Sequence, residues 1–498
     1  MQITDRIRDF FETYSGTIFD ADGNAVPTDQ LISEYSAIKS NLMRRAQPED
    51  VVGILLPYNY RYLLCILAAM ETGRVFVPMR LTWPASRIAQ VAQITRYQLL
   101  IDERAIESFC KWQGSPSVET FVPRSDMPLY IMCTSGSTGT PKAVIVGRSA
   151  YEAFFVALVQ FVAGISVEDH LLFVTDFTFD VSLMDVALLI HFRMKFYFSQ
   201  FGGNIFRLGH EIEKYGITCL TTVPNNIRML LREEMNERFD FSRLKRLFVG
   251  GANFPIDSYR KVFEKFMNGV ELYNFYGPTE ATIFCHASRL KGFEHSEVEG
   301  QFVTIGKPFP DVECKLISPS GVTVTTPLER GEMVLAGAQL MQGYCGSIDD
   351  WWIDISGTHF YRTGDTAFFD QLGNYYIAGR LDETLKRRGY RINLLDIDAY
   401  IRRLVCVQDA VTIACPDMDI ENILVTFIVL RRAQSLKDLR TELASQLVSY
   451  QMPDHIYFVE DFPLNDAGKV DRRVLLELFR CRACDGIVNQ FQAGTEIA

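Results

Sequence analysis

A run of small hydroxyl residues and glycines follows an apolar segment in the first third of the chain. The stretch "TSGSTGTPK" spans Thr134 to Lys142 and comes directly after the apolar residues "LYIMC". Hydroxyl groups and the backbone N–H groups of tight turns form concave sites that hold anions, and Lys142 adds a positive charge. The loop therefore suits a chain of phosphate groups. The alternative is a glycine-rich surface turn.

Three further segments each carry a charged residue in a turn-like context. They are "NFYGPTEATIF" with Glu280, "YRTGD" with Asp365 and "PLNDAGKVDRR" with Lys469. Taken singly, Asp365 is as easily an exposed acid after a glycine, and Lys469 a solvated lysine beside one. The hydroxyl-rich loop lacks the order GxxxxGK[ST], which argues against a P-loop nucleotide hydrolase.

The composition is that of a globular protein with more than one domain. The chain has 498 residues, 48% of them hydrophobic and 22% charged, and this length exceeds what one core usually organises. A net charge of −11 argues against a nucleic-acid binder, because phosphate backbones require a basic surface. Eleven cysteines without a framework spacing, no signal-peptide pattern and no apolar run of membrane length predict a cytoplasmic protein.

Strand and helix signals alternate along most of the chain. "VVGILLP" is typical of a buried strand, "YRYLLCILAAMETG" of a helix that Gly73 ends, and "RVFVPM" of the next strand. This alternation predicts an α/β fold in which layered, mostly parallel sheets are covered by helices. Such layers must bring the loops that carry the charged residues to one place.

The pattern changes after "YYIAGRLDETLKRRGYR". The strands "AVTIAC" and "ILVTFIVL", the helix "SLKDLRTELASQLVS" and the strand "HIYFVED" then predict a small α+β domain. We expect a large N-terminal domain over residues 1–381 and a small, mobile C-terminal domain over residues 382–498. Lys469 lies in the second domain.

Five segments together resemble the core motifs of the adenylate-forming superfamily. "TSGSTGTPK", "NFYGPTEATIF", "YRTGD", "GRLDETLKRRGYRIN" and "PLNDAGKVDRR" follow in this order, as in nonribosomal-peptide adenylation domains, acyl-CoA ligases and luciferases. The resemblance covers almost the whole chain, and five ordered motifs are far more specific than any one of them. It implies an enzyme that uses ATP and Mg²⁺ to convert a carboxylic acid into an acyl-adenylate.

The resemblance also implies roles for individual residues. Lys469, Thr138 and Glu280 would be catalytic, and Glu280 would hold Mg²⁺, a cation that prefers oxygen ligands. Tyr276 would stack on adenine, and Asp365 would accept the ribose hydroxyls. The residues that would bind ATP are Thr134, Ser135, Gly136, Ser137, Gly139, Lys142, Gly251, Asn274, Tyr276, Gly277, Thr279, Asp365 and Arg380.

The acyl pocket begins in the segment "TFDVSLMD", which matches the superfamily. Asp180 aligns with the acid that binds the α-ammonium group in amino-acid-activating members, and a buried carboxylate is costly without a partner. The alternative is an exposed loop acid. The other pocket residues carried over are Val181, Met184, Asn226, Phe248, Gly250, Phe275, Ile283 and Phe284. They predict a short, flat, apolar pocket, unless the aromatic residues belong to ordinary core.

Two kinds of acid fit these residues. One is a small aliphatic amino acid such as alanine or glycine, in a pocket shortened by Phe275 and Phe284. The other is a planar ortho-aminobenzoate that lies between aromatic rings and offers a ring hydroxyl to Asn226. We favour the aminobenzoate, because a small aliphatic acid needs neither Met184 nor so many rings.

The acceptor is inferred from the end of the sequence. The residues after Lys469 are too few for a carrier domain and lack its serine motif. We therefore expect a free-standing nonribosomal-peptide-type adenylation enzyme that loads the phosphopantetheine thiol of a separate carrier protein, as in antibiotic biosynthesis. The alternatives are a D-alanine–carrier-protein ligase, an aryl- or acyl-CoA ligase, and a catalytically silent scaffold protein.

The two half-reactions need different groups at one site. Lys469 and the "RRGYR" loop both follow Asp382 in the sequence. We therefore predict that Asp382 is a hinge about which the C-terminal domain rotates between adenylation and thioester formation.

Lys469 gives the first testable prediction. Lys469→Ala should lower the rate of adenylate formation by about 10²–10³ or more, because a donor that stabilises transition-state charge is lost. Folding should change little, since the lysine is expected to be exposed without ligand. Pyrophosphate exchange measures the effect, and a near-normal exchange rate in the variant would sink the assignment.

Overall fold

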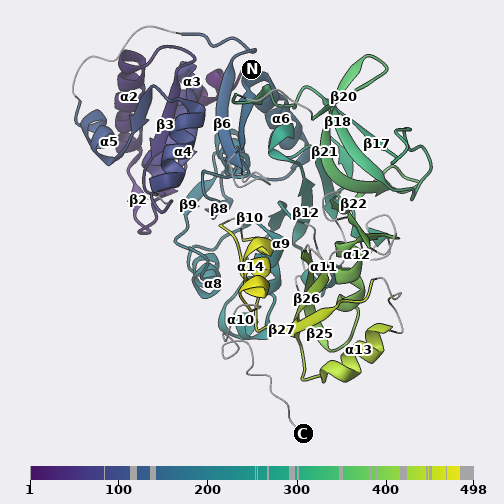
Figure 1. Ribbon diagram of the computed structural model, residues 1–498. Coiled ribbons are helices and arrows are strands. Elements are labelled where there is room, and N and C mark those ends of the chain that lie inside the picture. Colours follow the sequence, from purple (N-terminus) through teal and green to yellow (C-terminus); the bar gives the residue numbers. More distant parts are fainter. Residues whose placement is uncertain are drawn as a thin grey trace.

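The chain folds into three large sheets and a smaller C-terminal α+β unit (Figure 1). The computed structural model describes residues 2–83, 85–112, 121–134, 142–252, 254, 256–265, 269–290, 298–299, 302–346, 351–380, 384–387, 390–415, 423–444, 447, 451–466 and 468–482. Among these residues no helix is long and apolar enough to cross a membrane.

The first large sheet has nine strands, and its centre is parallel. In spatial order it contains β16 (Lys307–Pro308), β13 (His286–Leu290), β12 (Glu271–Tyr276), β11 (Arg246–Val249), β10 (Cys219–Thr222), β8 (His170–Phe173), β9 (Lys195–Phe198), β1 (Ile18–Phe19) and β2 (Ala25–Val26). Every neighbouring pair among strands β8 to β12 is parallel. On β11, Phe248 is paired with Thr221 of β10 on one side and with Tyr273 of β12 on the other. The carboxyl ends of these strands therefore meet at one edge.

The second large sheet has six strands. Its order is β19 (Gly343–Tyr344), β7 (Lys142–Gly147), β6 (Pro128–Thr134), β4 (Val75–Met79), β3 (Val51–Leu55) and β5 (Leu99–Ile101). The pairs formed among strands β3 to β6 are parallel. Strands β6 and β7 are antiparallel, with Thr134 opposite Lys142. The hydroxyl-rich loop is thus the connection of a hairpin, and its residues 135–141 lie outside the described part of the chain.

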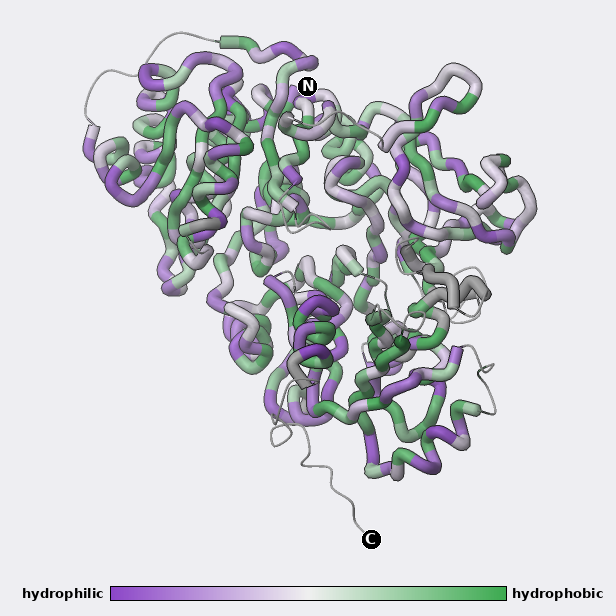
Figure 2. The backbone as a smooth tube through the Cα atoms, viewed as in Figure 1, coloured by the Kyte–Doolittle hydropathy of each residue, from purple (hydrophilic) through white to green (hydrophobic). Residues whose placement is uncertain are grey.

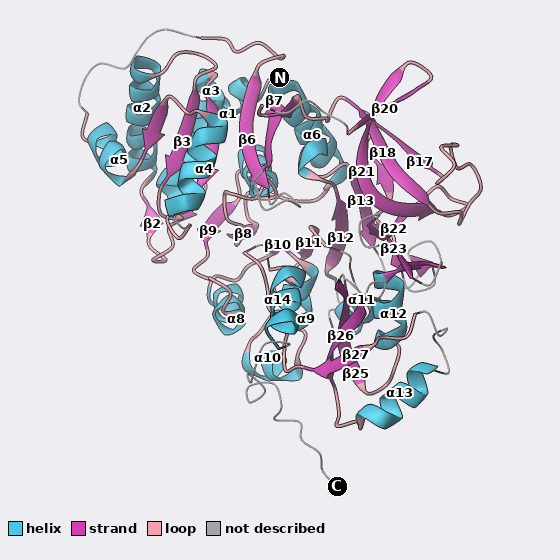
Figure 3. Ribbon diagram, in the orientation of Figure 1, coloured by secondary structure: helices cyan, strands magenta, loops and turns pink. Residues whose placement is uncertain are grey.

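Helices cover and separate the two sheets (Figure 3). They are α1 (Ile3–Thr13), α2 (Thr28–Arg45), α3 (Tyr60–Thr72), α4 (Ala85–Thr95), α5 (Glu103–Cys110), α6 (Arg148–Phe161), α7 (Ser182–Phe192), α8 (Ile205–Lys214), α9 (Pro224–Leu230), α10 (Glu233–Arg238) and α11 (Ile256–Lys265). Helices α1, α3, α6 and α7 contact one another and form one continuous apolar core with both sheets. Figure 2 shows this core as hydrophobic segments flanked by hydrophilic outer ones.

Helix α3 shows how local residues define an element. The Asn59 side chain accepts hydrogen bonds from the first free N–H groups, and Gly73 ends the helix with φ 72°, a left-handed conformation that glycine adopts without steric cost. Its residues between these ends are almost all buried. The predicted helix with its glycine stop is confirmed.

The third large sheet departs from the strand–helix alternation. It contains β17 (Val312–Ile317), β18 (Gly331–Gly337), β21 (Thr358–Phe369), β20 (Trp352–Ile355) and β22 (Tyr375–Arg380), and its pairs are antiparallel. Short turns connect β20 to β21 and β21 to β22, and antiparallel neighbours of this kind need no crossover helix. A two-stranded ribbon, β14 (Val298–Glu299) with β15 (Phe302–Val303), precedes it.

The C-terminal elements form a unit with cores of their own. They are β23 (Thr384–Arg387), β24 (Tyr390–Asn393), α12 (Leu394–Arg402), β25 (Val407–Cys415), β26 (Ile423–Leu430), α13 (Leu436–Ala444), β27 (His455–Phe458) and α14 (Arg472–Arg482). Helices α12 and α13 pack on one face of the sheet β25–β26–β27, and α14 packs on the other. The boundary at Asp382 stays a prediction, because residues 381–383 lie outside the described part.

Candidate active site

Four loops meet where the central strands of the nine-stranded sheet end. Because β8, β10, β11 and β12 are parallel neighbours, the residues after each strand lie at the same edge, where α/β sheets commonly bind ligands. The predicted residues in these loops are Asp180 after β8, Asn226 after β10, Gly250 and Gly251 after β11, and Gly277, Thr279 and Glu280 after β12. The fold therefore gathers residues from four separate segments.

Asp180 is buried at this edge, just before α7, and its side chain retains an unused acceptor. It is 7% exposed, so it is not an exposed loop acid. Burial raises the pKa of its carboxyl to about 6, and the nearby charge of Glu280 adds to the rise, whereas hydrogen bonds from the Thr279 side chain and the Val181 amide and the positive charge of Lys469 lower it. Its Oδ2 atom has no hydrogen-bond partner within the described part of the chain.

Glu280 lies in a short 3₁₀ turn, Thr279–Ala281, that follows β12. Its Oε1 atom accepts a hydrogen bond of 2.6 Å from the Tyr344 hydroxyl, and its backbone carbonyl accepts one of 2.8 Å from the Met341 amide. Tyr344 lies on β19 of the six-stranded sheet. The carboxylate is thus held at the junction of the two sheets.

The Glu280 loop continues through a strained segment. Thr282 and Ile283 have φ values of 55° and 70°, a region that a β-branched residue rarely adopts. A Cβ atom built on Gly277 would lie 2.6 Å from the Ile283 carbonyl oxygen, so only glycine allows this close approach. The Thr282 hydroxyl donates to the Gln339 carbonyl, and Gln339 donates to the Phe284 carbonyl at 3.2 Å. The surrounding structure therefore holds the loop in place.

Asp365 and Tyr276 form a second polar pair. The Tyr276 hydroxyl donates to Asp365 Oδ2 at 2.5 Å, and Asp365 is 7% exposed. Arg380 is opposite Asp365 on β22, but its side chain lies outside the described part. Asn274 is buried, and its amide donates to the Thr304 carbonyl at 2.8 Å.

Lys469 comes to the same edge from the C-terminal unit. Its loop is closed by hydrogen bonds with Asn465, one of 2.7 Å and one of 3.0 Å. A Cβ atom built on Gly251 would lie 3.7 Å from Lys469 Cε, and the lysine charge reaches Asp180. The structure therefore brings Lys469, Asp180, Thr279 and Glu280 together.

The aromatic residues of the predicted acyl pocket pack on one another. Phe275 and Phe284 stack with ring centroids 5.2 Å apart, and Phe248 lies 6.2 Å from Phe275. A Cβ atom built on Gly250 would lie 2.5 Å from Phe284 Cζ. Met184 and Ile283 are equally buried, and Val181 packs against the same core. Asn226 is buried with its amide 3.0 Å from the Thr222 hydroxyl.

Several contacting residues were missed from the sequence. Tyr344 and Trp351 flank Lys142, whose Nζ lies 5.4 Å and 3.9 Å from the two ring centroids, yet neither has a local signal. Arg80 lies 2.8 Å from Asp176 in the loop before Asp180. A charged residue directly after the buried strand β4 was the signal that could have identified it.

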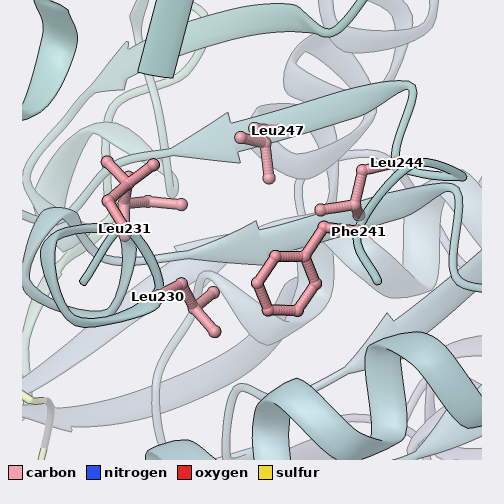
Figure 4. A pocket seen from close by; sticks show the side chains of 6 residues that line it. Leu230, Leu231, Phe241, Leu244 and Leu247 are labelled. Carbon is pink, nitrogen blue, oxygen red and sulfur yellow. The ribbon is translucent and has the colours of Figure 1, made fainter. Parts of the chain in front are cut away.

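A separate apolar pocket lies between helix α9 and strand β11 (Figure 4). Its lining side chains, Ile227, Leu230, Leu231, Phe241, Leu244 and Leu247, are all hydrocarbon. It offers no group that could bind charge or transfer a proton, so the polar edge of the nine-stranded sheet remains the candidate site.

The predicted phosphate-loop residues Ser135, Gly136, Ser137, Thr138 and Gly139 lie outside the described part of the chain.

Residues 39–345 match the profile of the AMP-binding enzyme family, and residues 396–469 match that of the AMP-binding enzyme C-terminal domain. The chain belongs to the AMP-binding enzyme family. This match confirms the adenylate-forming superfamily that the sequence motifs predicted. It also confirms the predicted enzyme class, an ATP-dependent, AMP-forming ligase.

Similar proteins include a gramicidin synthase and two proteins of known structure. A linear gramicidin synthase of Brevibacillus parabrevis is 28% identical over 91% of this chain, which spans 9% of that protein. Klebsiella oxytoca NpsA, in complex with 3-hydroxyanthranilyl-AMSN, has a TM-score of 0.81 at 22% identity, over 96% of this chain and 99% of that one. ATP-bound MatB of Rhodopseudomonas palustris has a TM-score of 0.82 at 18% identity, over 96% and 99%. These likenesses confirm the fold class.

The contact at Gly250 gives a stability prediction. Gly250→Ala should destabilise the protein by about 1–3 kcal/mol, because the new methyl group overlaps the Phe284 ring in a packed core. Thermal unfolding of the variant and of Gly250→Ala/Phe284→Leu measures the effect. The double variant should recover part of the loss, and a loss that Phe284→Leu only deepens would contradict this packing.

Proposed function

We propose that this chain activates an amine-bearing carboxylic acid as an acyl-adenylate and transfers it to the phosphopantetheine thiol of a separate carrier protein. The observation that carries the proposal is the Asp180 carboxylate, buried with one unpartnered oxygen in a cluster with Thr279, Glu280 and Lys469. A buried acceptor without a donor is costly, and a substrate amine would supply that donor.

The first step joins two anions, so it depends on positive charge at the reacting atoms. A carboxylate oxygen of the acid attacks the α-phosphorus of ATP, the bond to the β-phosphate breaks, and pyrophosphate leaves. Lys469 stabilises the charge that develops, since it reaches the same edge as Asp180. In the second step the carrier thiol gives its proton to water and its sulfur attacks the acyl carbon, the bond from that carbon to the phosphate oxygen breaks, and AMP leaves.

The nucleotide is held by residues on both sides of this edge. Asp365, paired with Tyr276, accepts the ribose hydroxyls, and the Tyr276 ring supports the adenine. The Glu280 carboxylate supplies an oxygen ligand of the kind that Mg²⁺ prefers, and one of its oxygens is already oriented by Tyr344. A bound Mg²⁺ would neutralise phosphate charge there.

The acid itself is a compact one, and an ortho-aminobenzoate fits best. The Phe284 ring stacks on Phe275 and fills the space beside Gly250, which argues against a long side chain, and flat rings favour a flat ligand by about 0.5–1.5 kcal/mol beyond area. The amine of an aminobenzoate is neutral and donates N–H groups to Asp180. NpsA, a neighbour by fold, holds a 3-hydroxyanthranilyl group, and another neighbour, AB3403, is bound to glycine, so the choice over glycine rests on the aromatic rings.

A panel of acids tests the substrate. We expect anthranilate and hydroxyanthranilate to support faster ATP–pyrophosphate exchange than either alanine enantiomer or glycine. A clear preference for an alanine would overturn the aminobenzoate, and a preference for an acid without an amine would overturn the role of Asp180. Transfer of the preferred acyl group to a carrier protein rather than to coenzyme A completes the test.

The pH dependence tests Asp180 more sharply. Burial raises its pKa to about 6, so the carboxylate gains a proton as the pH falls from 7 to 5 and becomes a poorer acceptor for an amine. Below that pKa, kcat/KM for exchange should fall about tenfold per pH unit with an amine-bearing acid. The desamino acid is the matched control and should lack this fall.

The variant Asp180→Asn removes the titrating group. It should lower kcat/KM for the amine-bearing acid roughly 10- to 150-fold, since a hydrogen bond to a charged group contributes about 1.5–3 kcal/mol, and it should flatten the acid limb of the profile. An unchanged profile in Asp180→Asn would assign the titration to another group.

A further inference from the structure

A line of alternating charges joins the C-terminal unit to the large N-terminal sheets. Arg228 on α9 donates from Nη1 to Asp409 Oδ2 at 2.8 Å, and Arg402 on α12 donates from Nε to the other oxygen of Asp409 at 2.6 Å. Arg472 then lies 3.1 Å from Asp398, which is fully buried. One carboxylate, Asp409, thus bridges an arginine of each unit.

The local structure of both partners directs them to this contact. Asp409 lies at a bulge in β25, where the register with β26 shifts between Val407 and Asp409, and bulges turn side chains away from their regular direction. Arg228 is also held by Asn225, whose Oδ1 accepts from its Nη2 at 2.7 Å. Neither side chain has to be ordered by the ion pair alone.

The Arg228–Asp409 pair is more shielded from water than its neighbours. Both side chains are 17% exposed. Arg232 and Asp461 form a parallel contact across the same boundary, but their charged atoms are 3.9 Å apart and the side chains are 42% and 52% exposed. Exposed pairs contribute little, whereas the loss of one partner of a shielded pair is costly.

This contact coincides with the arrangement that brings Lys469 to the candidate site. The unit that carries Asp409 also carries Lys469, whose Cε lies beside Gly251. Helix α9 carries Asn226, a predicted pocket residue, two positions before Arg228, and residues two apart point to nearly opposite sides of a helix. Helix α9 therefore has one side toward the predicted acyl pocket and the other side toward the C-terminal unit.

We propose that Arg228 is a positioning residue that, through Asp409, holds the C-terminal unit in the orientation that places Lys469 at the site. Arg228 thereby supports acyl-adenylate formation and contributes nothing to the later attack of the carrier thiol. This inference rests on the proposed function, because it assigns the contact to one of its two half-reactions.

The two half-reactions, measured separately, test the assignment. Arg228→Met keeps the apolar part of the side chain and removes its charge. We expect pyrophosphate exchange to be about tenfold slower, which corresponds to about 1.4 kcal/mol, while thiol transfer from purified acyl-adenylate stays within about twofold of the unaltered protein. Arg228→Lys should restore most of the exchange rate, and Arg232→Met is the matched control that should leave both rates unchanged.

The variants also separate positioning from a general loss of stability. Arg228→Met combined with Asp409→Asn should slow exchange by less than the product of the two single effects, because both changes break the Arg228–Asp409 contact, although each also removes a contact of its own, Arg228 with Asp461 and Asp409 with Arg402. Equal losses in both half-reactions, no loss in exchange, or the same loss in Arg232→Met would each overturn the proposal.

A readout that needs no activity distinguishes this inference from the proposed function. Arg228→Lys puts a primary amine beside Asp409, so carbodiimide treatment should join residues 228 and 409 by an amide bond that mass spectrometry detects. Arg232→Lys should link to Asp461 much less, given the longer distance. Absence of the 228–409 link would overturn the contact, whereas a link without exchange on any acid would confirm the contact and overturn the proposed function, and with it the role assigned to Arg228 in adenylate formation.

Discussion

The carboxylate of Asp180 is buried with a second carboxylate, that of the half-buried Glu280, nearby, and much of the site is arranged around that cost. Asp180 and Glu280 follow different strands of one parallel sheet, and both burial and the neighbouring charge raise the pKa of Asp180. Such a pair needs donors and cations to remain ionised. The Thr279 and Tyr344 side chains supply donors, and the cation Lys469 comes from a separate unit of the chain. A site built in this way is completed only when that unit is in place.

The segment after β12, which contains Ile283, is correspondingly held in one conformation. Ile283 has a strained backbone that Gly277 and the Gln339 hydrogen bonds hold in position. Strain of this kind persists only where packing over-determines the conformation. Phe275 and Phe284 stack directly beside this segment, so the shape offered to a substrate is fixed before one arrives.

The N-terminal sheets and the C-terminal unit therefore contribute different parts of the site. The large sheets hold the residues of the proposed acyl pocket and the buried acceptor Asp180, while Lys469 brings positive charge from the C-terminal unit across a boundary of ion pairs. The proposed function requires this boundary to form and separate, and ion pairs suit such a boundary because apolar surface would be exposed to water on separation. Arg228 with Asp409 and Arg80 with Asp466 both lie on this boundary.

The sequence by itself determined the superfamily and the alternating elements, and it proposed the chemistry-bearing residues. Phosphate, metal and carboxylate chemistry needs particular residue types, so motifs such as "YRTGD" and "NDAGKVDRR" keep a recognisable order, and signals such as Asn59 and Gly73 act on their own helix. Only the tertiary structure decided which charges meet. Arg228 and Asp409, or Tyr344 and Glu280, are far apart in the chain and carry no local signal, because their pairing depends on how whole sheets and units pack. The sequence did not predict the antiparallel pairing of the third sheet for the same reason. Which strands pair depends on the packing of the whole fold and not on the residues of a single strand.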